Sequence, residues 1–120
     1  MGGVLASESE CLFCQVVRGD LPAEVVLENE HAIAFRDINP KAPTHVLVIP
    51  RSHHTDVGSL AQAAPDVAAA LLATAREVAE HEGHGDAYRL VFNTGAAVGQ
   101  SVFHVHGHVL AGRELGWPPG

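Results

Sequence analysis

The chain has 120 residues, a formal net charge of −7 and only seven lysines and arginines. Its 47% hydrophobic and 18% charged residues are typical of a folded protein and exclude a disordered chain. So few cations exclude the basic face that binding to a nucleic-acid backbone requires, and no apolar stretch has the length of a membrane span. We therefore expect no nucleic-acid or membrane partner, and any small anionic ligand must be bound by local groups.

The beginning of the chain predicts a tail rather than a targeting signal. The first ten residues turn acidic and lack the basic start of a secretory signal. We expect residues 1–10 to be a disordered tail, residues 11–120 to form one domain, and the protein to be cytoplasmic. In a reducing compartment, the C-x-x-C pair Cys11 and Cys14 indicates a redox motif or a metal clip before a structural disulfide.

The sequence predicts two helices and five strands. A short helix is expected over residues 11–18, and a long helix begins at Pro65 and ends before Gly83. The long helix has one apolar face formed by Val67, Leu71, Ala75, Val78 and Ala79. Strands are predicted at 24–28, 32–37, 45–49, 88–93 and 101–111. The pattern predicts an α+β fold with an antiparallel sheet of about five strands, whose edge a homodimer could cover.

Three histidines on alternate residues are the strongest signal of function. The strand period would place His104, His106 and His108 on one face, with Phe103 and Val105 on the other. Such a row suits attack by one imidazole on phosphorus, with its neighbours holding the phosphate oxygens. It also suits a zinc site, because neutral imidazoles bind zinc. A solvated, His-rich edge strand without function is the third interpretation.

The row resembles the signature H-φ-H-φ-H-φ-φ of the histidine-triad nucleotide-binding family, with Gly107 at a normally apolar position. The resemblance continues through residues 11–14, 34–40, 42–53 and 99–103, and residues 117–120 resemble the adenosine phosphoramidase branch. It implies a homodimer whose two sheets join. It also implies cleavage of purine nucleoside 5′-phosphoramidates through a covalent nucleotidyl-histidine on His106, with no cofactor for catalysis. The preference for adenine or guanine is left open.

The resemblance also implies a role for individual residues. His106 would attack through one ring nitrogen while the other donates to a backbone carbonyl. His108 would contact a phosphate oxygen, and His104 with His45 would polarise the cluster or relay a proton. The implied substrate-binding residues are Asp37, Asn93, Gly99, Gln100, Ser101, Leu12, Phe13, Val16, Phe35, Ile38 and Trp117. Without the resemblance, the apolar members would be core residues, Asp37 a loop cap and Asn93 a turn former.

Some members of the resembled family hold a structural zinc, and the matching residues here are Cys11, Cys14, His53 and His104. Two cysteines and two histidines would make a closed tetrahedral site. Two buried thiols beside an exposed His53 are the alternative. For the function, the alternatives are a zinc hydrolase with the triad as ligands and a non-catalytic nucleotide-binding module. Gly107 is expected to add backbone freedom between His106 and His108.

Overall fold

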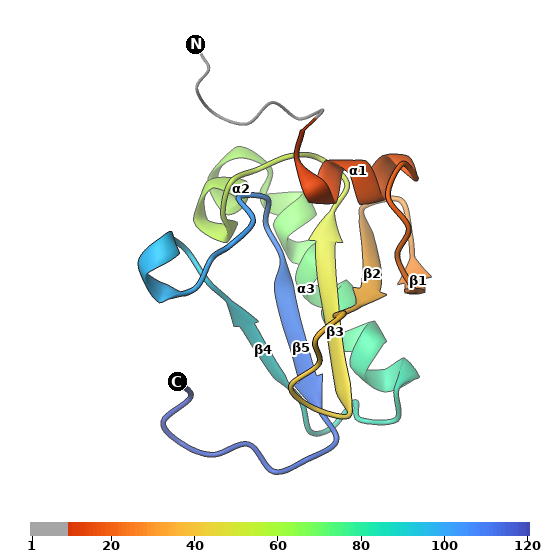
Figure 1. Ribbon diagram of the computed structural model, residues 1–120, viewed down its shortest axis with the longest axis vertical. Coiled ribbons are helices and arrows are strands. Elements are labelled where there is room, and N and C mark those ends of the chain that lie inside the picture. Colours follow the sequence, from red (N-terminus) through yellow and green to blue (C-terminus); the bar gives the residue numbers. More distant parts are fainter. Residues whose placement is uncertain (1–9) are drawn as a thin grey trace.

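The computed structural model describes residues 10–120, and a five-stranded antiparallel sheet forms its centre (Figure 1). The strands are β1 (Val25–Glu28), β2 (Ala32–Arg36), β3 (Thr44–Pro50), β4 (Arg89–Phe92) and β5 (Gly107–Ala111), in the order β1-β2-β3-β5-β4. The helices are α1 (Leu12–Arg18), α2 (Val57–Ala63) and α3 (Pro65–His81), with a short 3-10 turn η1 (Ala96–Val98). The predicted α+β class with an antiparallel sheet is confirmed. The expected tail, apart from Glu10, lies outside the described residues.

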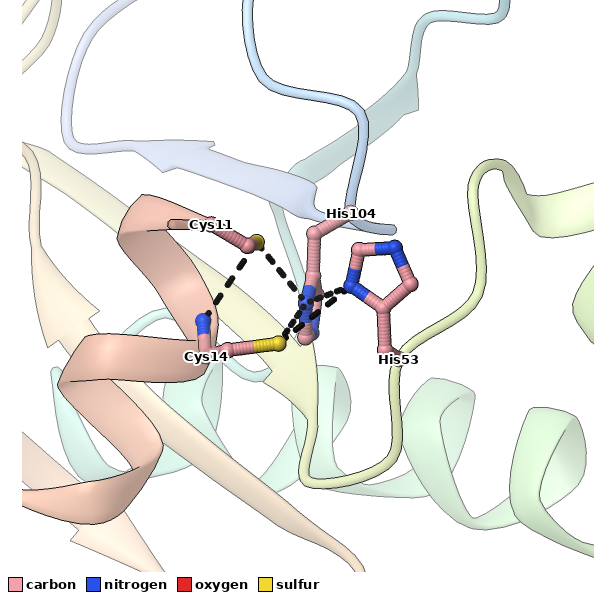
Figure 2. Close-up of side chains that lie close together, drawn as sticks. All are labelled: Cys11, Cys14, His53 and His104. Carbon is pink, nitrogen blue, oxygen red and sulfur yellow. Dashed lines mark hydrogen bonds between the residues drawn. The ribbon is translucent and has the colours of Figure 1, made fainter. Parts of the chain in front are cut away.

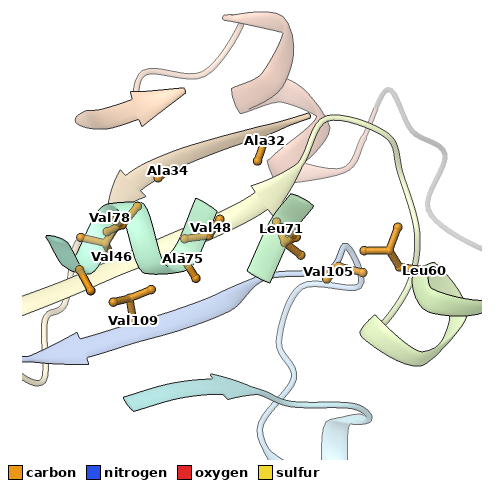
Figure 3. Close-up of a cluster of buried hydrophobic side chains, with 11 residues drawn as sticks. Ala32, Ala34, Val46, Val48, Leu60, Leu71, Ala75, Val78, Val105 and Val109 are labelled. Atoms are coloured by element: carbon orange, nitrogen blue, oxygen red, sulfur yellow. The ribbon is translucent and has the colours of Figure 1, made fainter. Parts of the chain in front are cut away.

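Helices cover the two faces of the sheet. Ala34, Val46 and Val48 pack against the long helix α3 in the cluster drawn in Figure 3, because alternate strand residues point to the same face. The intervening residues Phe35 and Leu47 belong to a second cluster, which contains α1. Strand β3 is buried along its whole length because it is covered on both sides. The second face carries the functional side chains.

The predicted helices are confirmed. Pro65 is the first residue of α3, and four of the five predicted apolar positions, Leu71, Ala75, Val78 and Ala79, are buried, while Val67 packs beside them. Helix α1 ends at Gly19, whose φ of 81° is left-handed. Helix α2 was not predicted from the sequence; its signal is Asp56, whose side chain accepts from the Ser59 backbone N–H. No helix within residues 10–120 is long and apolar enough to cross a membrane.

Four strands begin and end within one residue of the prediction, but the strand predicted at 101–111 begins only at Gly107. The segment before it leaves the sheet, because the Val105 N–H donates to the His54 carbonyl at 2.9 Å. The prediction that the three histidines share one strand face is therefore wrong. Phe103 is also half exposed instead of packed.

Candidate functional site

A pocket of about 530 Å³ lies against α1 on the second face of the sheet. We call it the α1 pocket. The predicted residues that line it are Leu12, Phe13, Val16, Phe35, Asp37, Ile38, Ser101, His106 and His108. Leu12 and Ile38 are exposed at its edge, so the alternative that they are core residues is wrong for these two. The volume is in the range of small-molecule sites.

His106 is held in one tautomer by the backbone. Its Nδ1 lies 2.9 Å from the His104 carbonyl oxygen. A carbonyl only accepts hydrogen bonds, so Nδ1 carries the proton and a neutral ring keeps its lone pair on Nε2. The Phe13 ring lies edge-on to the His106 ring, with centroids 5.0 Å apart. The predicted hydrogen bond from this ring to a backbone carbonyl is confirmed, and Nε2 is left as a potential nucleophile.

Two successive hydrogen bonds, from Lys41 to His45 and from His45 to His108, orient the His108 ring. The Lys41 backbone N–H donates to His45 Nδ1 at 3.0 Å, so a neutral His45 carries its proton on Nε2. His45 Nε2 lies 2.9 Å from His108 Nδ1, which must then accept. His108 therefore carries its own proton on Nε2 and offers it as a donor. The sequence paired His45 with His104, but the structure pairs it with His108.

Burial keeps these two rings neutral. Burial, helped by the neighbouring imidazoles of His106 and His45, lowers the pKa of His108 to about 4. Burial also lowers the pKa of His45, with Asp37 opposing that shift from 3.4 Å away. A neutral His106 ring therefore presents its lone pair beside an N–H donor on His108.

The loop before β5 carries the remaining predicted polar residues. Gly99 has a φ of 103°, a left-handed value that favours glycine. Gln100 is buried, and its amide braces the loop by accepting from the Gly95 N–H and donating to the Thr55 and Val102 carbonyls. Its side chain is therefore engaged in holding the loop. Ser101 lines the α1 pocket.

A second pocket, of about 450 Å³, adjoins the same histidines. It is lined by Asn93 together with Asp37, His45 and His108. Trp117 is 84% exposed and lines neither pocket in this chain, although Pro119 lines the second one. The role of Trp117 in substrate binding stays a prediction.

The four predicted metal ligands converge (Figure 2). The Cys14 Sγ lies 3.3 Å from His53 Nδ1 and 3.5 Å from His104 Nδ1, and the two Nδ1 atoms are 3.2 Å apart. The Cys11 Sγ lies 3.5 Å from His104 Nδ1. With ordinary zinc bond lengths, a tetrahedral site places S and N ligand atoms about 3.5 Å apart and two N atoms about 3.3 Å apart. The residues therefore fit a tetrahedral zinc ion.

The tautomer of His104 fits a metal as well. Its Nε2 lies 2.9 Å from the Pro50 carbonyl oxygen, so Nε2 carries the proton and Nδ1 presents its lone pair to the cluster. The alternative with an exposed His53 is not supported, because His53 is half-buried within this group.

The three triad rings do not converge on one point. His104 belongs to the Cys/His group, His108 belongs to a group with Asp37 and His45, and His106 belongs to neither. His45 Nε2 carries a proton in the neutral ring because Lys41 donates to its Nδ1, so this atom has no lone pair for a metal. This geometry disfavours a metal held by the triad.

Gly107 meets a packing requirement. A Cβ on this residue would lie 2.8 Å from Cζ and 2.9 Å from Cε1 of Phe92, and 3.0 Å from Cδ1 of Leu90. We expected Gly107 to loosen the backbone. The structure shows instead that it lets β5 pack closely against side chains of the edge strand β4. This contact could not be predicted from the sequence, because it depends on the pairing of Phe92 with Gly107.

Among the lining residues that were missed from the sequence, two are charged. Glu24 and Arg36 lie in the wall of the α1 pocket and form an ion pair. The predicted strands at 24–28 and 32–37 already placed these two residues next to each other. Their charges, however, are typical of a solvated strand edge.

Fold and site together define a small α+β protein with a pocket lined by histidines, and residues 18–115 match the model of the HIT domain. The chain belongs to the HIT domain family. It is 42% identical to the "14 kDa zinc-binding protein" of Zea mays over 94% of this chain and 90% of that protein.

Solved structures of similar fold agree with this family assignment. The HIT family hydrolase from Legionella pneumophila Philadelphia 1 matches with a TM-score of 0.87 and 44% identity, covering 92% of this chain and 99% of that one. The histidine triad nucleotide-binding protein from Candida albicans matches with a TM-score of 0.77 and 26% identity, covering 90% and 82%.

Proposed function

We propose that this protein hydrolyses purine nucleoside 5′-phosphoramidates, as enzymes of the adenosine phosphoramidase type do, through a nucleotidyl group on His106. The observation that carries the proposal is the fixed tautomer of His106. Its Nδ1–H donates to the His104 carbonyl, so that the lone pair on Nε2 is available to attack a substrate. The names of the Legionella and Candida relatives support hydrolysis and nucleotide binding.

In the proposed reaction, His106 Nε2 attacks the α-phosphorus and forms a P–N bond. The bond from phosphorus to the leaving amine breaks, and the amine departs with a proton taken up from solvent, which the attacking water returns in the second step. Water then attacks the same phosphorus, releases the nucleoside monophosphate and restores neutral His106. The route divides one difficult displacement into two easier ones.

His108 acts in this proposal as a hydrogen-bond donor to a phosphate oxygen. It does not supply the amine's proton. A proton lost from His108 would have to be replaced through His45, and His45 is hydrogen-bonded to the Lys41 backbone amide, which is not an acid. His104 contributes its carbonyl to His106, and His45 positions His108. Ser101 and the turn at Gly99 would bind phosphate, and Asp37 would accept from the ribose hydroxyls.

We further propose a structural zinc ion bound by Cys11, Cys14, His53 and His104. Zinc would fix α1 to the segment before β5, because two of the ligands lie at the start of α1 and one in that segment. This arrangement would keep Phe13 against His106. The zinc-binding name of the Zea mays relative supports the proposal. The metal would supply rigidity, and four protein ligands would leave it no open position for substrate.

We also propose a cytoplasmic homodimer whose sheets join, with Trp117 near the partner's site. An edge strand with half-buried apolar residues, β4, supports this proposal. Light scattering after size exclusion should give about twice the mass of 12.6 kDa. A monomer at micromolar concentration would contradict the homodimer.

The function is tested by hydrolysis of adenosine 5′-phosphoramidate by wild-type protein and His106→Ala, each with and without a strong chelator. We expect wild-type turnover that a brief exposure to chelator leaves intact and that His106→Ala abolishes, with binding of nucleoside monophosphate retained. Turnover that depends on metal, with a folded protein by circular dichroism, would instead support a zinc hydrolase. Nucleotide binding without any turnover would support a binding module.

A further inference from the structure

The second pocket, of about 450 Å³, continues from the α1 pocket along the same face of the sheet. The two pockets share Asp37 and His108, whereas His106 lines only the α1 pocket and Leu110 lines only the second one. Leu110 lies on the same face of β5 as His108, because alternate strand residues share a face. Val91, which pairs with His108, continues this face on β4. The second pocket therefore extends from His108 along β5 and β4, away from His106.

The second pocket lies where a leaving group must depart. In a displacement at phosphorus, the attacking and leaving atoms lie roughly in line on opposite sides of the phosphorus. If the nucleoside occupies the apolar α1 pocket and the phosphorus lies between His106 and His108, the attack by His106 directs the leaving amine into the second pocket. The group that the amine carries then contacts the side chains that line this pocket.

Basic side chains without a carboxylate partner gather around the second pocket. The chain has seven lysines and arginines. Four of them form ion pairs with carboxylates, namely Arg18, Arg36, Arg51 and Arg76. Within residues 10–120, the remaining three form no such pair: Lys41, Arg89 and Arg113. Their positive charges are therefore not neutralised by an acidic side chain, although the chain as a whole carries a formal net charge of −7.

These three residues lie in or beside the second pocket. Lys41 lines it. Arg113 donates from Nε to the Lys41 carbonyl at 2.9 Å. Arg89, on β4, donates to the Gly116 carbonyl at 2.8 Å and so holds the C-terminal tail, whose Pro119 lines the pocket (Figure 1). The pocket is therefore suited to an anionic group.

Lys41, the only lysine of the chain, is the basic residue that lines the pocket itself. Its backbone N–H donates to His45 Nδ1 at 3.0 Å. Burial lowers the pKa of His45, Asp37 opposes this shift, and the Lys41 ammonium adds to it, so the ammonium lies close enough to act on the site. Asp37 also lines the pocket, but its carboxylate accepts from the Asn39 N–H at 2.8 Å and lies 3.4 Å from the His45 ring. Lys41 is therefore the cation that an anion in this pocket can contact.

We propose that the second pocket binds the leaving group of the substrate, and that Lys41 is a specificity-determining residue that selects a leaving group with a negative charge, a carboxylate or a phosphate. This inference rests on the proposed function and names the class of substrate that the same site prefers; the bonds formed and broken are those of the proposed reaction. Val91, Leu110 and Pro119 contact the aliphatic part between the amine and the anion. Lys41 is exposed, so water competes for its ammonium and the preference is moderate. We expect kcat/KM to favour an anionic leaving group about fivefold over a neutral one of the same length.

The experiment measures kcat/KM for the adenosine 5′-phosphoramidates of γ-aminobutyrate and of its carboxamide, two amines that have the same length and differ in charge. We expect the ratio of the two values to be about five in wild-type protein and about one in Lys41→Gln. This substitution removes the charge and keeps the backbone N–H that holds His45. Lys41→Arg should retain most of the ratio. Arg76→Gln is the matched control, because it removes one positive charge from an exposed position of α3 that lines neither pocket, and it should leave the ratio unchanged.

A second pair of substrates, the adenosine 5′-phosphoramidates of phosphoethanolamine and ethanolamine, identifies the anion. A preference that Lys41→Gln removes in only one pair assigns the pocket to a carboxylate or to a phosphate. The two proposals fail separately. Turnover of all four substrates, with no preference that depends on Lys41 in either pair, overturns only the inference about the second pocket. If wild-type protein turns over none of them, the proposed function fails, and the Kd ratios of the same pairs, measured by calorimetry with and without Lys41→Gln, decide the inference.

Discussion

Gly107→Ala is a direct test of the packing that places His106 and His108. The new methyl group would lie 2.8 Å from Cζ of Phe92 and 3.0 Å from Cδ1 of Leu90, so at least one side chain or β5 itself must move. Inserting an extra carbon into a packed site costs about 1–3 kcal/mol. Phe92 is only half-buried on an edge strand, so its ring has room to turn. We therefore expect the free energy of unfolding to fall by about 1–2 kcal/mol.

Urea denaturation followed by circular dichroism measures this loss. Phe92→Leu removes the two ring atoms nearest to the new methyl, so the double variant should recover about 1 kcal/mol relative to the sum of the single changes. Gly116→Ala is the control, since a Cβ there meets no atom within 4 Å, and its effect should stay within about 0.5 kcal/mol. Full stability of Gly107→Ala, or strict additivity with Phe92→Leu, would refute the packing explanation.

Three further predictions concern metal, pH and the core. Cys14→Ser should lower bound zinc from one per chain to a small fraction and lower the Tm, as measured by metal analysis and calorimetry on untagged protein; wild-type protein free of zinc would contradict the ligand set. Stability should fall as pH drops from 6.5 towards 4, because His108 stays neutral in the native state with a pKa of about 4, whereas the unfolded chain takes up a proton near 6.5. This fall should be smaller in His108→Gln, and an unchanged pH profile of unfolding would count against it. Leu71→Ala should cost about 2–5 kcal/mol in urea denaturation because Leu71 is 1% exposed in the cluster under α3, and a loss below about 1 kcal/mol would show that the site collapses.

The sequence carried most of the fold because its patterns are local. Pro65, the apolar face of α3 and the strand alternation each act over a few residues, and they predicted α1, α3 and the first four strands to within about a residue. The start of β5 was wrong because the hydrogen bond from Val105 to His54 joins residues far apart in the chain. Alternating side chains do not reveal such a bond.

The sequence predicted which residues form the candidate site, but it did not predict the hydrogen bonds among them. The residue types of the Cys/His group and of the α1 pocket were identifiable by resemblance, and the structure brings them together. The groups that fix the tautomers are backbone atoms, the Lys41 N–H and the His104 and Pro50 carbonyls, which no residue letter encodes. The pairing of His45 with His108 depended on these atoms.

His104 joins the two parts of the site. Its ring lies in the Cys/His group, and its carbonyl accepts from the His106 ring. Removal of the His104 side chain should therefore disturb both parts of the site. This connection explains why a metal with a purely structural role would lie beside a reaction that uses no metal.

The most direct test of the nucleophile is mass spectrometry of the protein after mixing with adenosine 5′-phosphoramidate and quenching in base, which preserves a P–N bond. We predict the mass of one adenylyl group on the peptide that contains His106, formed before product appears in the steady state and absent in His106→Ala. Steady turnover with no adduct on that peptide, together with retained turnover in His106→Ala, would contradict a histidine nucleophile.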